Sequence, residues 1–137
     1  VGAGAGLGFG MSLLGARLLD GAEAGAAAVG LGAALEHADL LVTGTAVLGW
    51  HELAGSPVTV AAAAAAERGI PVVGICGRTE AGRRETMAAG FSGAYAVASS
   101  LGQWSAFAVD PAGALASRAE AVARTWSPQE QCRPKNS

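Results

Sequence analysis

The sequence predicts an α/β fold in three layers, with helices on both faces of a small parallel sheet. Three short apolar runs, at residues 40–43, 71–76 and 94–97, have the length and composition of buried strands. Helical stretches separate them, and strands that alternate with helices form parallel βαβ units. Such strands need cover on both faces, and three of them make only a small sheet. We therefore expect an incomplete domain whose remaining neighbours come from elsewhere.

The first quarter of the chain predicts helices. Residues 7–19 carry leucines at helical spacing, and the Asp-Gly pair at 20–21 ends that pattern. Residues 23–37 are rich in alanine, and glycines in their middle predict two short helices, the second over 33–37. His37 falls at the end of this second helix. An imidazolium suits the helix dipole there, so we expect His37 to cap the helix.

Glycine alternates with small or apolar residues through residues 1–10. One interpretation is a phosphate-binding loop that uses the backbone of Gly4, Gly6 and Gly8, because glycine lets N–H groups approach an anion closely. The dinucleotide-binding fingerprint is not met, since Leu, Phe or Met stands five places after each of the first three glycines. The alternative is a glycine-rich helix start that packs against a neighbour. The sequence leaves both interpretations open.

Residues 39–56 form the candidate ligand-binding stretch. The first predicted strand is broken by a Thr-Gly pair, and we expect a polar loop after it that contains His51 and Glu52. Ser56 then precedes a proline, which is the N-cap and first-turn pattern of a helix. Strand, loop and helix in this order place ligand-binding groups at the carboxyl edge of a parallel sheet. The residues expected to bind substrate or phosphate here are Thr43, Gly44, Thr45 and Ser56.

The alternation continues to the end of the domain. A helix over 57–68, almost all alanine, leads to the second strand, and a helix over 80–89 leads to the third. Arg78 follows the second strand, where its guanidinium either meets a phosphate or is a solvated loop side chain. Residues 99–109 are expected to be irregular. An Asp-Pro pair then begins a helix over 111–126.

Composition excludes two classes of partner. The 137 residues carry a formal net charge of −2 and scattered basic residues, which gives no electrostatic footprint for nucleic acid. No apolar run approaches the ~20 residues that cross a membrane. Cys76 and Cys132 are expected to be free thiols in a reducing compartment, so we expect a cytoplasmic protein. The chain opens with Val1 inside a glycine run, which favours a fragment or a processed product.

Five segments carry a family resemblance through their order along the chain. They are the glycine run of residues 2–10, Leu-Gly-Ala-Arg-Leu at 14–18, Ala-Asp-Leu-Leu-Val-Thr-Gly at 38–44, Leu-Ala-Gly-Ser-Pro at 53–57 and Gly-Ile-Pro-Val-Val-Gly-Ile at 69–75. Together they resemble the carboxyl-terminal third of the bacterial glycerate kinase family, over residues 1–126. The resemblance implies a Rossmann-like fold. Residues 1–21 would be a remnant of the family's inserted domain, 22–126 a Rossmann-like subdomain and 127–137 a flexible tail.

The family phosphorylates D-glycerate with ATP and Mg²⁺, so the resemblance implies a nucleotide and a hydroxy acid as ligands. Its signature reads Thr-Gly-Glu-Gly-Arg-Leu-Asp, with a later Gly-Lys. Phosphoryl transfer uses such carboxylates and cations to hold Mg²⁺ and to stabilise phosphate charge. In this chain the glutamate, arginine, aspartate and lysine positions hold Thr45, Val47, Gly49 and Ser56. We assign no metal ligands.

Two functions therefore remain open. One is a glycerate kinase relative in which His51 and Glu52 act as a replacement acid–base pair, which requires an irregular loop, because adjacent residues on a helix or strand point apart. The other is a non-catalytic module of the same fold that binds a ligand or another subunit. A nicotinamide-dependent oxidoreductase is disfavoured, since no strand precedes the glycine run. In each case we expect a homodimer or a partner chain to cover the sheet.

Overall fold

The computed structural model describes residue 4 and residues 6–127. The helices and strands are α1 (Leu7–Leu13), α2 (Gly21–Ala28), α3 (Leu31–Leu35), β1 (Leu41–Leu48), α4 (Trp50–Leu53), α5 (Pro57–Ala66), β2 (Val72–Thr79), α6 (Arg83–Ala88), β3 (Gly93–Ala96), α7 (Leu101–Val109) and α8 (Pro111–Trp126). Cys132 and all but the first residue of the expected tail at 127–137 lie outside the described residues. The expected α/β class is confirmed.

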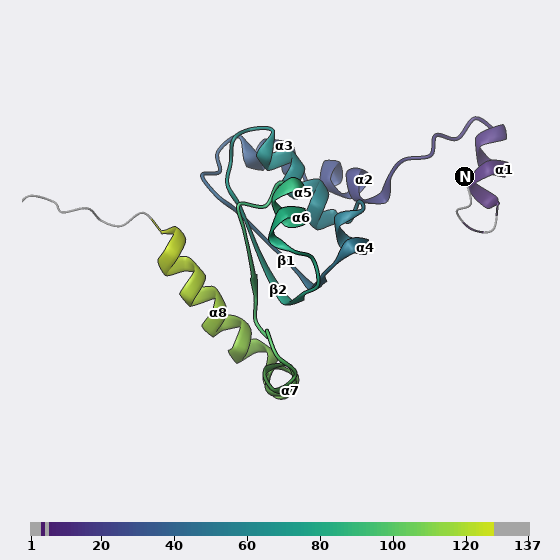
Figure 1. The fold of residues 1–137 in the computed structure, drawn as a ribbon. Coiled ribbons are helices and arrows are strands. Elements are labelled where there is room, and N and C mark those ends of the chain that lie inside the picture. The colour runs from purple at the N-terminus through teal and green to yellow at the C-terminus, as the bar shows by residue number, and fades with distance from the viewer. Residues whose placement is uncertain (1–3, 5, 128–137) are drawn as a thin grey trace, which may run out of the picture.

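The three strands form one parallel sheet in the order β1-β2-β3. Leu41 of β1 lies opposite Val72 of β2, and Val73 of β2 lies opposite Gly93 of β3. Helices α2 to α6 lie on one side of this sheet and α8 lies on the other (Figure 1). The carboxyl ends of the strands therefore share one edge, and the chain turns there into α4 and α7.

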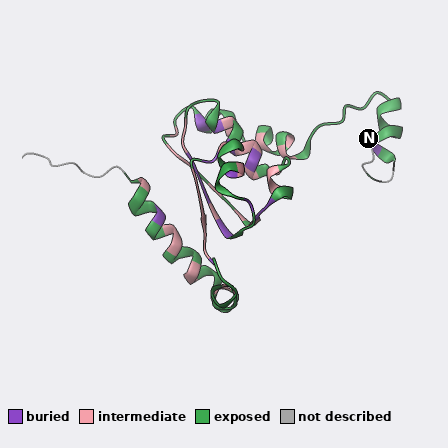
Figure 2. Ribbon diagram, in the orientation of Figure 1, coloured by how far each residue is buried: buried purple, intermediate pink, exposed green. Residues whose placement is uncertain are grey.

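The main core lies between the sheet and α5 (Figure 2). Alanine lets α5 pack close to the sheet, because a methyl group takes up little space between the helix and the strands. Ala62 and Ala65 are fully buried against Val72 and its neighbours. The one buried polar side chain of α5, Thr59, is satisfied, since its hydroxyl donates to the carbonyl oxygens of Ser56 at 2.9 Å and Glu52 at 3.1 Å. Burying it therefore carries little desolvation cost.

Helix α8 forms the second helical layer. Asp110 caps its start, where Oδ1 accepts from the Gly113 N–H at 2.9 Å. Val122 is buried, and the indole Nε1 of Trp126 donates to the hydroxyl oxygen of Tyr95 on β3 at 2.9 Å. A capped helix and an inter-layer hydrogen bond thus fix α8 over the β2 and β3 side of the sheet.

The first strand is longer than predicted. We expected Thr43 and Gly44 to end it, but β1 runs on to Leu48, paired with β2. A Cβ placed on Gly44 would lie 2.6 Å from the carbonyl oxygen of Ile75. The glycine is thus required by the close approach of the two strands and does not break the strand. The polar loop expected over the following residues is absent, and α4 takes its place.

Two further expectations were wrong in detail. The helix predicted over 7–19 stops at Leu13, and Gly15 follows with a positive φ of 87°. The segment predicted to be irregular at 99–109 contains α7, which Ser100 caps by accepting from the Gln103 N–H. The first helix lies apart from the sheet at the end of a linker (Figure 1). The division at residue 21 into two domains stays a prediction.

Candidate functional site

The candidate site is a pocket of about 350 Å³ at the carboxyl edge of the sheet. It lies between the ends of β2 and β3 and the start of α7. In parallel α/β sheets this edge is where ligands bind, because the loops that follow the strands converge there. The residues that line it are Arg78, Thr79, Ala96, Ala98, Ser99, Ser100, Leu101 and Trp104.

Arg78 supplies the positive charge of the pocket. Its guanidinium lies 2.7 Å from Glu80 Oε1 and 5.6 Å from the ring centroid of Trp104. Both partners of the ion pair are about half exposed, at 50% and 54%, so the pair is worth little and leaves the guanidinium free to take another anion. The indole face supports the cation from one side. The arrangement orients Arg78 without neutralising it completely.

The start of α7 adds hydrogen-bond donors. The Ser99 N–H donates to Gln103 Oε1 at 2.8 Å, and the Ser100 hydroxyl oxygen accepts from the Gln103 N–H at 3.3 Å. The N–H groups of Leu101 and Gly102 stand in the first turn, where a helix has no internal acceptor for them. The positive end of the helix dipole therefore faces the pocket that contains Arg78. A guanidinium and a helix start together suit a phosphate or a carboxylate.

The four positions that the sequence resemblance aligns with charged groups, Thr45, Val47, Gly49 and Ser56, lie on β1 and in the segment that follows it. Thr45 uses its hydroxyl locally, donating to the Val47 carbonyl oxygen at 3.4 Å. At Gly49 a Cβ would lie 3.2 Å from Glu80 Oε2 and 3.5 Å from Glu52 Oε2. Two carboxylates therefore flank the place where an aspartate would project. The sequence interpretation missed Glu80, because its approach to Gly49 depends on the pairing of β1 with β2.

His51 and Glu52 lie on α4, where consecutive side chains do not face each other. Glu52 has a structural task, since its Oε2 accepts from the Gly49 N–H at 3.1 Å at the start of that helix. His51 is exposed. The irregular loop that an acid–base pair needed is not formed. Ser56 stands before α5, and its hydroxyl lies 3.5 Å from that of Thr59.

The described glycines of the opening run are not brought to this pocket. Gly4 and Gly6 adopt positive φ angles of 61° and 99°, and Gly8 lies inside the seven-residue helix α1. In Figure 1 this helix stands apart from the carboxyl edge of the sheet. Of the residues predicted to bind ligand, Arg78 lines the pocket. Thr43, Gly44 and Thr45 lie within β1 instead.

The donor set does not fit a magnesium site of the kind the family resemblance implies. Within residue 4 and residues 6–127, no three His, Cys, Asp or Glu side chains lie close enough together to hold a metal ion. Glu52 and Glu80 are only a pair, and each is already engaged, by the Gly49 N–H and by Arg78. Magnesium binding in kinases depends on carboxylates together with substrate phosphates. The described residues therefore do not form a magnesium site of that kind.

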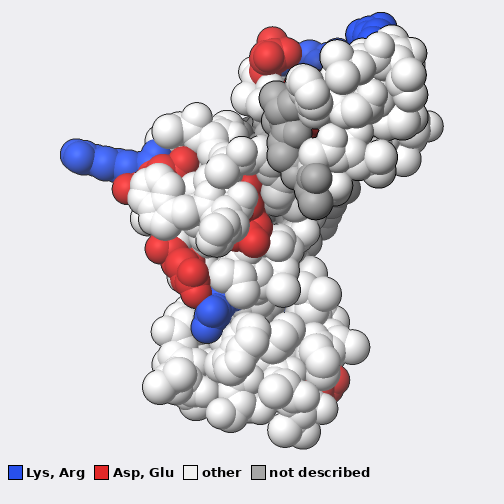
Figure 3. Space-filling view, turned by 90° about the vertical axis from the view of Figure 1, so that its right-hand side faces the viewer, with Lys and Arg blue, Asp and Glu red and all other residues white. Residues whose placement is uncertain are grey.

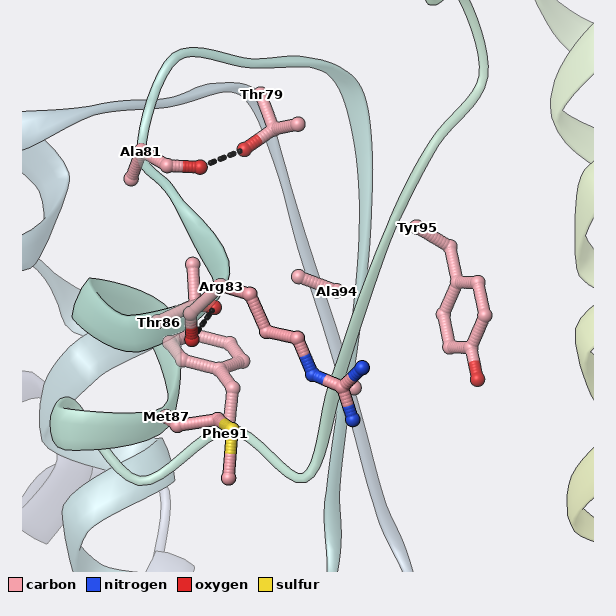
Figure 4. A pocket seen from close by; sticks show the side chains of 9 residues that line it. Thr79, Ala81, Arg83, Thr86, Met87, Phe91, Ala94 and Tyr95 are labelled. Atoms are coloured by element: carbon pink, nitrogen blue, oxygen red, sulfur yellow. Dashed lines mark hydrogen bonds between the residues drawn. The ribbon is translucent and has the colours of Figure 1, made fainter.

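A second pocket, of about 390 Å³, lies beside β3 (Figure 4). Its threonines are occupied within the chain, since the Thr79 hydroxyl donates to the Ala81 carbonyl and the Thr86 hydroxyl to the Arg83 carbonyl, both at 3.0 Å. The Arg83 side chain extends across the opening. This pocket offers one cation, and the helix that begins beside it, α6, has only six residues, so it is the weaker candidate.

Neither the surface charges nor the helices of the described residues indicate a further binding site. On the face shown in Figure 3, Lys and Arg side chains lie apart from one another and among acidic ones. None of the helices that the structure describes is long and apolar enough to cross a bilayer.

Comparison with known proteins gives one match. A family model described as the glycerate kinase family matches residues 1–127. No curated protein and no solved structure matches the chain. The match covers nearly the whole chain. This protein therefore belongs to the glycerate kinase family.

Proposed function

We propose that this chain binds the phosphate or carboxylate group of a small molecule, a hydroxy acid or a nucleotide, at the carboxyl-edge pocket, and that it does not catalyse phosphoryl transfer by itself. We place it in the cytoplasm. The observation that supports the proposal is the shared position of Arg78, held against Trp104, and the first turn of α7 in one pocket. Family members phosphorylate D-glycerate with ATP, so both ligand classes carry a suitable anion.

The expected affinity is modest. An anion in this pocket gains a bidentate contact with the guanidinium and a contact with α7 N–H groups. Each charge-assisted hydrogen bond contributes about 1.5 to 3 kcal/mol. Because the pocket is open and Arg78 is half exposed, solvent screens the interaction, and we expect a dissociation constant of about 1 mM.

The proposed absence of phosphoryl transfer depends on the residues near Gly49. Catalysis of phosphoryl transfer requires charges placed against the transferring group, since positioning and electrostatic stabilisation supply almost all of the rate. Here Thr45 and Val47 are neutral, and Glu52 caps a helix. Ser56 offers a hydroxyl where the family uses a lysine, which removes the cation for the developing phosphate charge.

Titration followed by amide NMR tests the binding. Inorganic phosphate, D-glycerate and ATP are each titrated into the full chain, and we expect shifts at the Leu101 and Gly102 amides. Arg78→Ala should weaken binding at least five-fold, whereas Arg84→Ala, a matched loss of charge on α6, should leave it unchanged. Absence of shifts at the start of α7, or equal weakening by both variants, would contradict the proposed pocket.

A coupled assay of ADP release tests the absence of catalysis. The full chain is incubated with D-glycerate, ATP and Mg²⁺, and we expect a rate equal to the background without protein. Turnover above background that is lost in Glu52→Gln or Glu80→Gln would overturn this part and return the chain to the catalytic members of the family.

A further inference from the structure

The charge of the carboxyl-edge pocket depends on a residue that does not line it. Among the lining residues in the described part of the chain, Arg78 is the one with a charged side chain. Glu80 lies just outside, and its Oε1 is 2.7 Å from the Arg78 guanidinium. The formal charges of these two side chains cancel. A ligand anion that enters the pocket therefore meets a cation that already has an anionic partner.

The backbone fixes Glu80 close to Arg78. Arg78 lies within β2, opposite Val47 of β1. Two residues later, the Glu80 N–H donates to the carbonyl oxygen of Leu48 at 2.9 Å, and the Ala81 N–H donates to the same oxygen at 3.1 Å. Leu48 is buried, so this anchor belongs to the core of the fold. The carboxylate of Glu80 is thus held beside Arg78 by a fixed segment of backbone.

The surroundings of Gly49 favour the contact between Glu80 and Arg78. A Cβ built on Gly49 would lie 3.2 Å from Glu80 Oε2 and 3.5 Å from Glu52 Oε2, so the two carboxylates are neighbours. Glu52 is held there, because its Oε2 accepts from the Gly49 N–H at 3.1 Å. The negative charge of Glu52 repels Glu80, whereas the guanidinium of Arg78 attracts it. Both forces favour the ion pair.

Arg78 also has a support that does not depend on Glu80. Its guanidinium carbon lies 5.6 Å from the centroid of the Trp104 ring. This ring is itself packed, since a Cβ built on Gly77 would lie 3.1 Å from Trp104 Cζ3, and the Phe107 ring centroid is 5.3 Å from that of Trp104. An indole face attracts a guanidinium without neutralising it. Removing the charge of Glu80 should therefore leave Arg78 in the pocket.

We propose, on the basis of the function proposed above, that Glu80 determines the charge preference of this pocket: it lowers the affinity for anions, and most of all for anions with two negative charges. With Glu80 in place, the ion pair has no net charge, so a second negative charge on the ligand gains little attraction. Without Glu80, one positive charge remains, and the attraction grows with the charge of the ligand. Glu80 thus shifts the pocket toward carboxylates and away from phosphates, which carry nearly two charges at neutral pH.

The expected effects are small but measurable. Both side chains are about half exposed, so solvent screens them, and an ion pair of this kind changes an equilibrium by up to about five-fold. We expect Glu80→Gln to tighten the binding of acetate about two-fold and that of sulfate about four-fold. The dissociation constant of sulfate divided by that of acetate should therefore fall about two-fold.

Amide NMR titrations of the full chain with sodium acetate and sodium sulfate, at one ionic strength, test the role of Glu80. Binding is followed at the Leu101 and Gly102 amides in the wild type and in Glu80→Gln. Glu67→Gln is the matched control, because Glu67 is exposed after α5, at the edge of the sheet where β2 begins. It removes the same charge far from the pocket and should leave both dissociation constants unchanged.

Two more variants separate the charge of Glu80 from its shape. Glu80→Asp keeps the charge and should keep the ratio of the wild type. Glu80→Ala removes the charge together with the side chain and should give the ratio of Glu80→Gln, so it replaces that variant if Glu80→Gln does not fold. Far-UV circular dichroism checks the folding of each variant.

The results that would overturn the role of Glu80 differ in what they say of the pocket. Absence of shifts at Leu101 and Gly102 in every variant and with both anions would remove the pocket and the role of Glu80 together. Binding by the wild type that Glu80→Gln leaves unchanged or weakens would overturn the role of Glu80 alone, since Glu80 would then only support Arg78. An equal gain for acetate and sulfate, or a Glu80→Asp variant that behaves like Glu80→Gln, would also overturn it.

Discussion

Replacing Gly44 with alanine tests the closeness of β1 and β2. A Cβ at this position would lie 2.6 Å from the Ile75 carbonyl oxygen, whereas carbon and oxygen in adjacent strands ordinarily stand about 3.3 Å apart. The strands would have to separate by about 0.7 Å at this point, and the hydrogen bonds on either side would lengthen. Overpacking of this kind costs about 1 to 3 kcal/mol.

Part of this cost is offset in the unfolded chain. Alanine restricts the unfolded backbone more than glycine does, which is worth about 0.4 to 1 kcal/mol in favour of folding. The expected net effect of Gly44→Ala is therefore a loss of about 1 to 2 kcal/mol in the free energy of unfolding. Urea unfolding followed by far-UV circular dichroism measures it.

Gly25→Ala is the matched control. Gly25 lies inside α2, and a Cβ there would have nothing within 4 Å. Alanine is the better helix former, so this variant should gain about 0.5 to 1 kcal/mol. The two substitutions are chemically identical and should shift stability in opposite directions. If Gly44→Ala is as stable as the wild type, the close strand approach does not exist and the explanation of the glycine is wrong.

Three further predictions concern other parts of the fold. Asp110→Ala removes the acceptor for the Gly113 N–H at the start of α8 and should lower the urea midpoint by an amount that corresponds to about 1 kcal/mol. Tyr95→Phe leaves the Trp126 indole N–H without its partner and should lower the free energy of unfolding by about 1 kcal/mol, measured by urea unfolding. Burial raises the pKa of the Cys76 thiol to about 11 from a usual value of 9.0. The folded state therefore holds its proton to higher pH than the unfolded state, so this contribution to stability is complete below pH 9 and falls by about 2 to 3 kcal/mol as the pH rises to 11. Urea unfolding at pH 8 and pH 10.5, compared with Cys76→Ala, measures it, and an unchanged difference between the two pH values would contradict the assignment.

Sequence reasoning predicted the class of fold and the carboxyl edge as the site. The alanine-rich segment that became α5 and the valine run that became β2 have strong local preferences, and the structure follows them. The prediction that β1 ends at Gly44 was wrong. Glycine is required there by the close approach of the neighbouring strand β2, and not by a turn in the local backbone. No single-sequence pattern reports the distance between two strands.

The candidate site was predicted only in part. Arg78 was found because it comes shortly after the apolar run of residues 71–76, although in the structure it lies within β2 and not in the loop that was expected there. Ser100 and Trp104 were missed, although the serine that caps α7 is a recognisable start signal, because Gly102 and the polar residues around it favoured an irregular segment. Their place beside Arg78 depends on the pairing of β2 with β3, which brings distant segments to one edge.

Helix α5 has a consequence for how this chain can vary. Its buried and exposed faces are both lined mainly by methyl groups. The difference in polarity between the two faces is therefore too small to fix the rotation of the helix about its axis. Thr59 makes the two faces different, because its hydroxyl has hydrogen-bond acceptors only when this residue faces the segment between α4 and α5. Substituting valine for Thr59 keeps the shape of the side chain but removes the hydroxyl whose hydrogen bonds fix the rotation of the helix. We expect such a chain to retain its helical content while its α5 occupies more than one orientation.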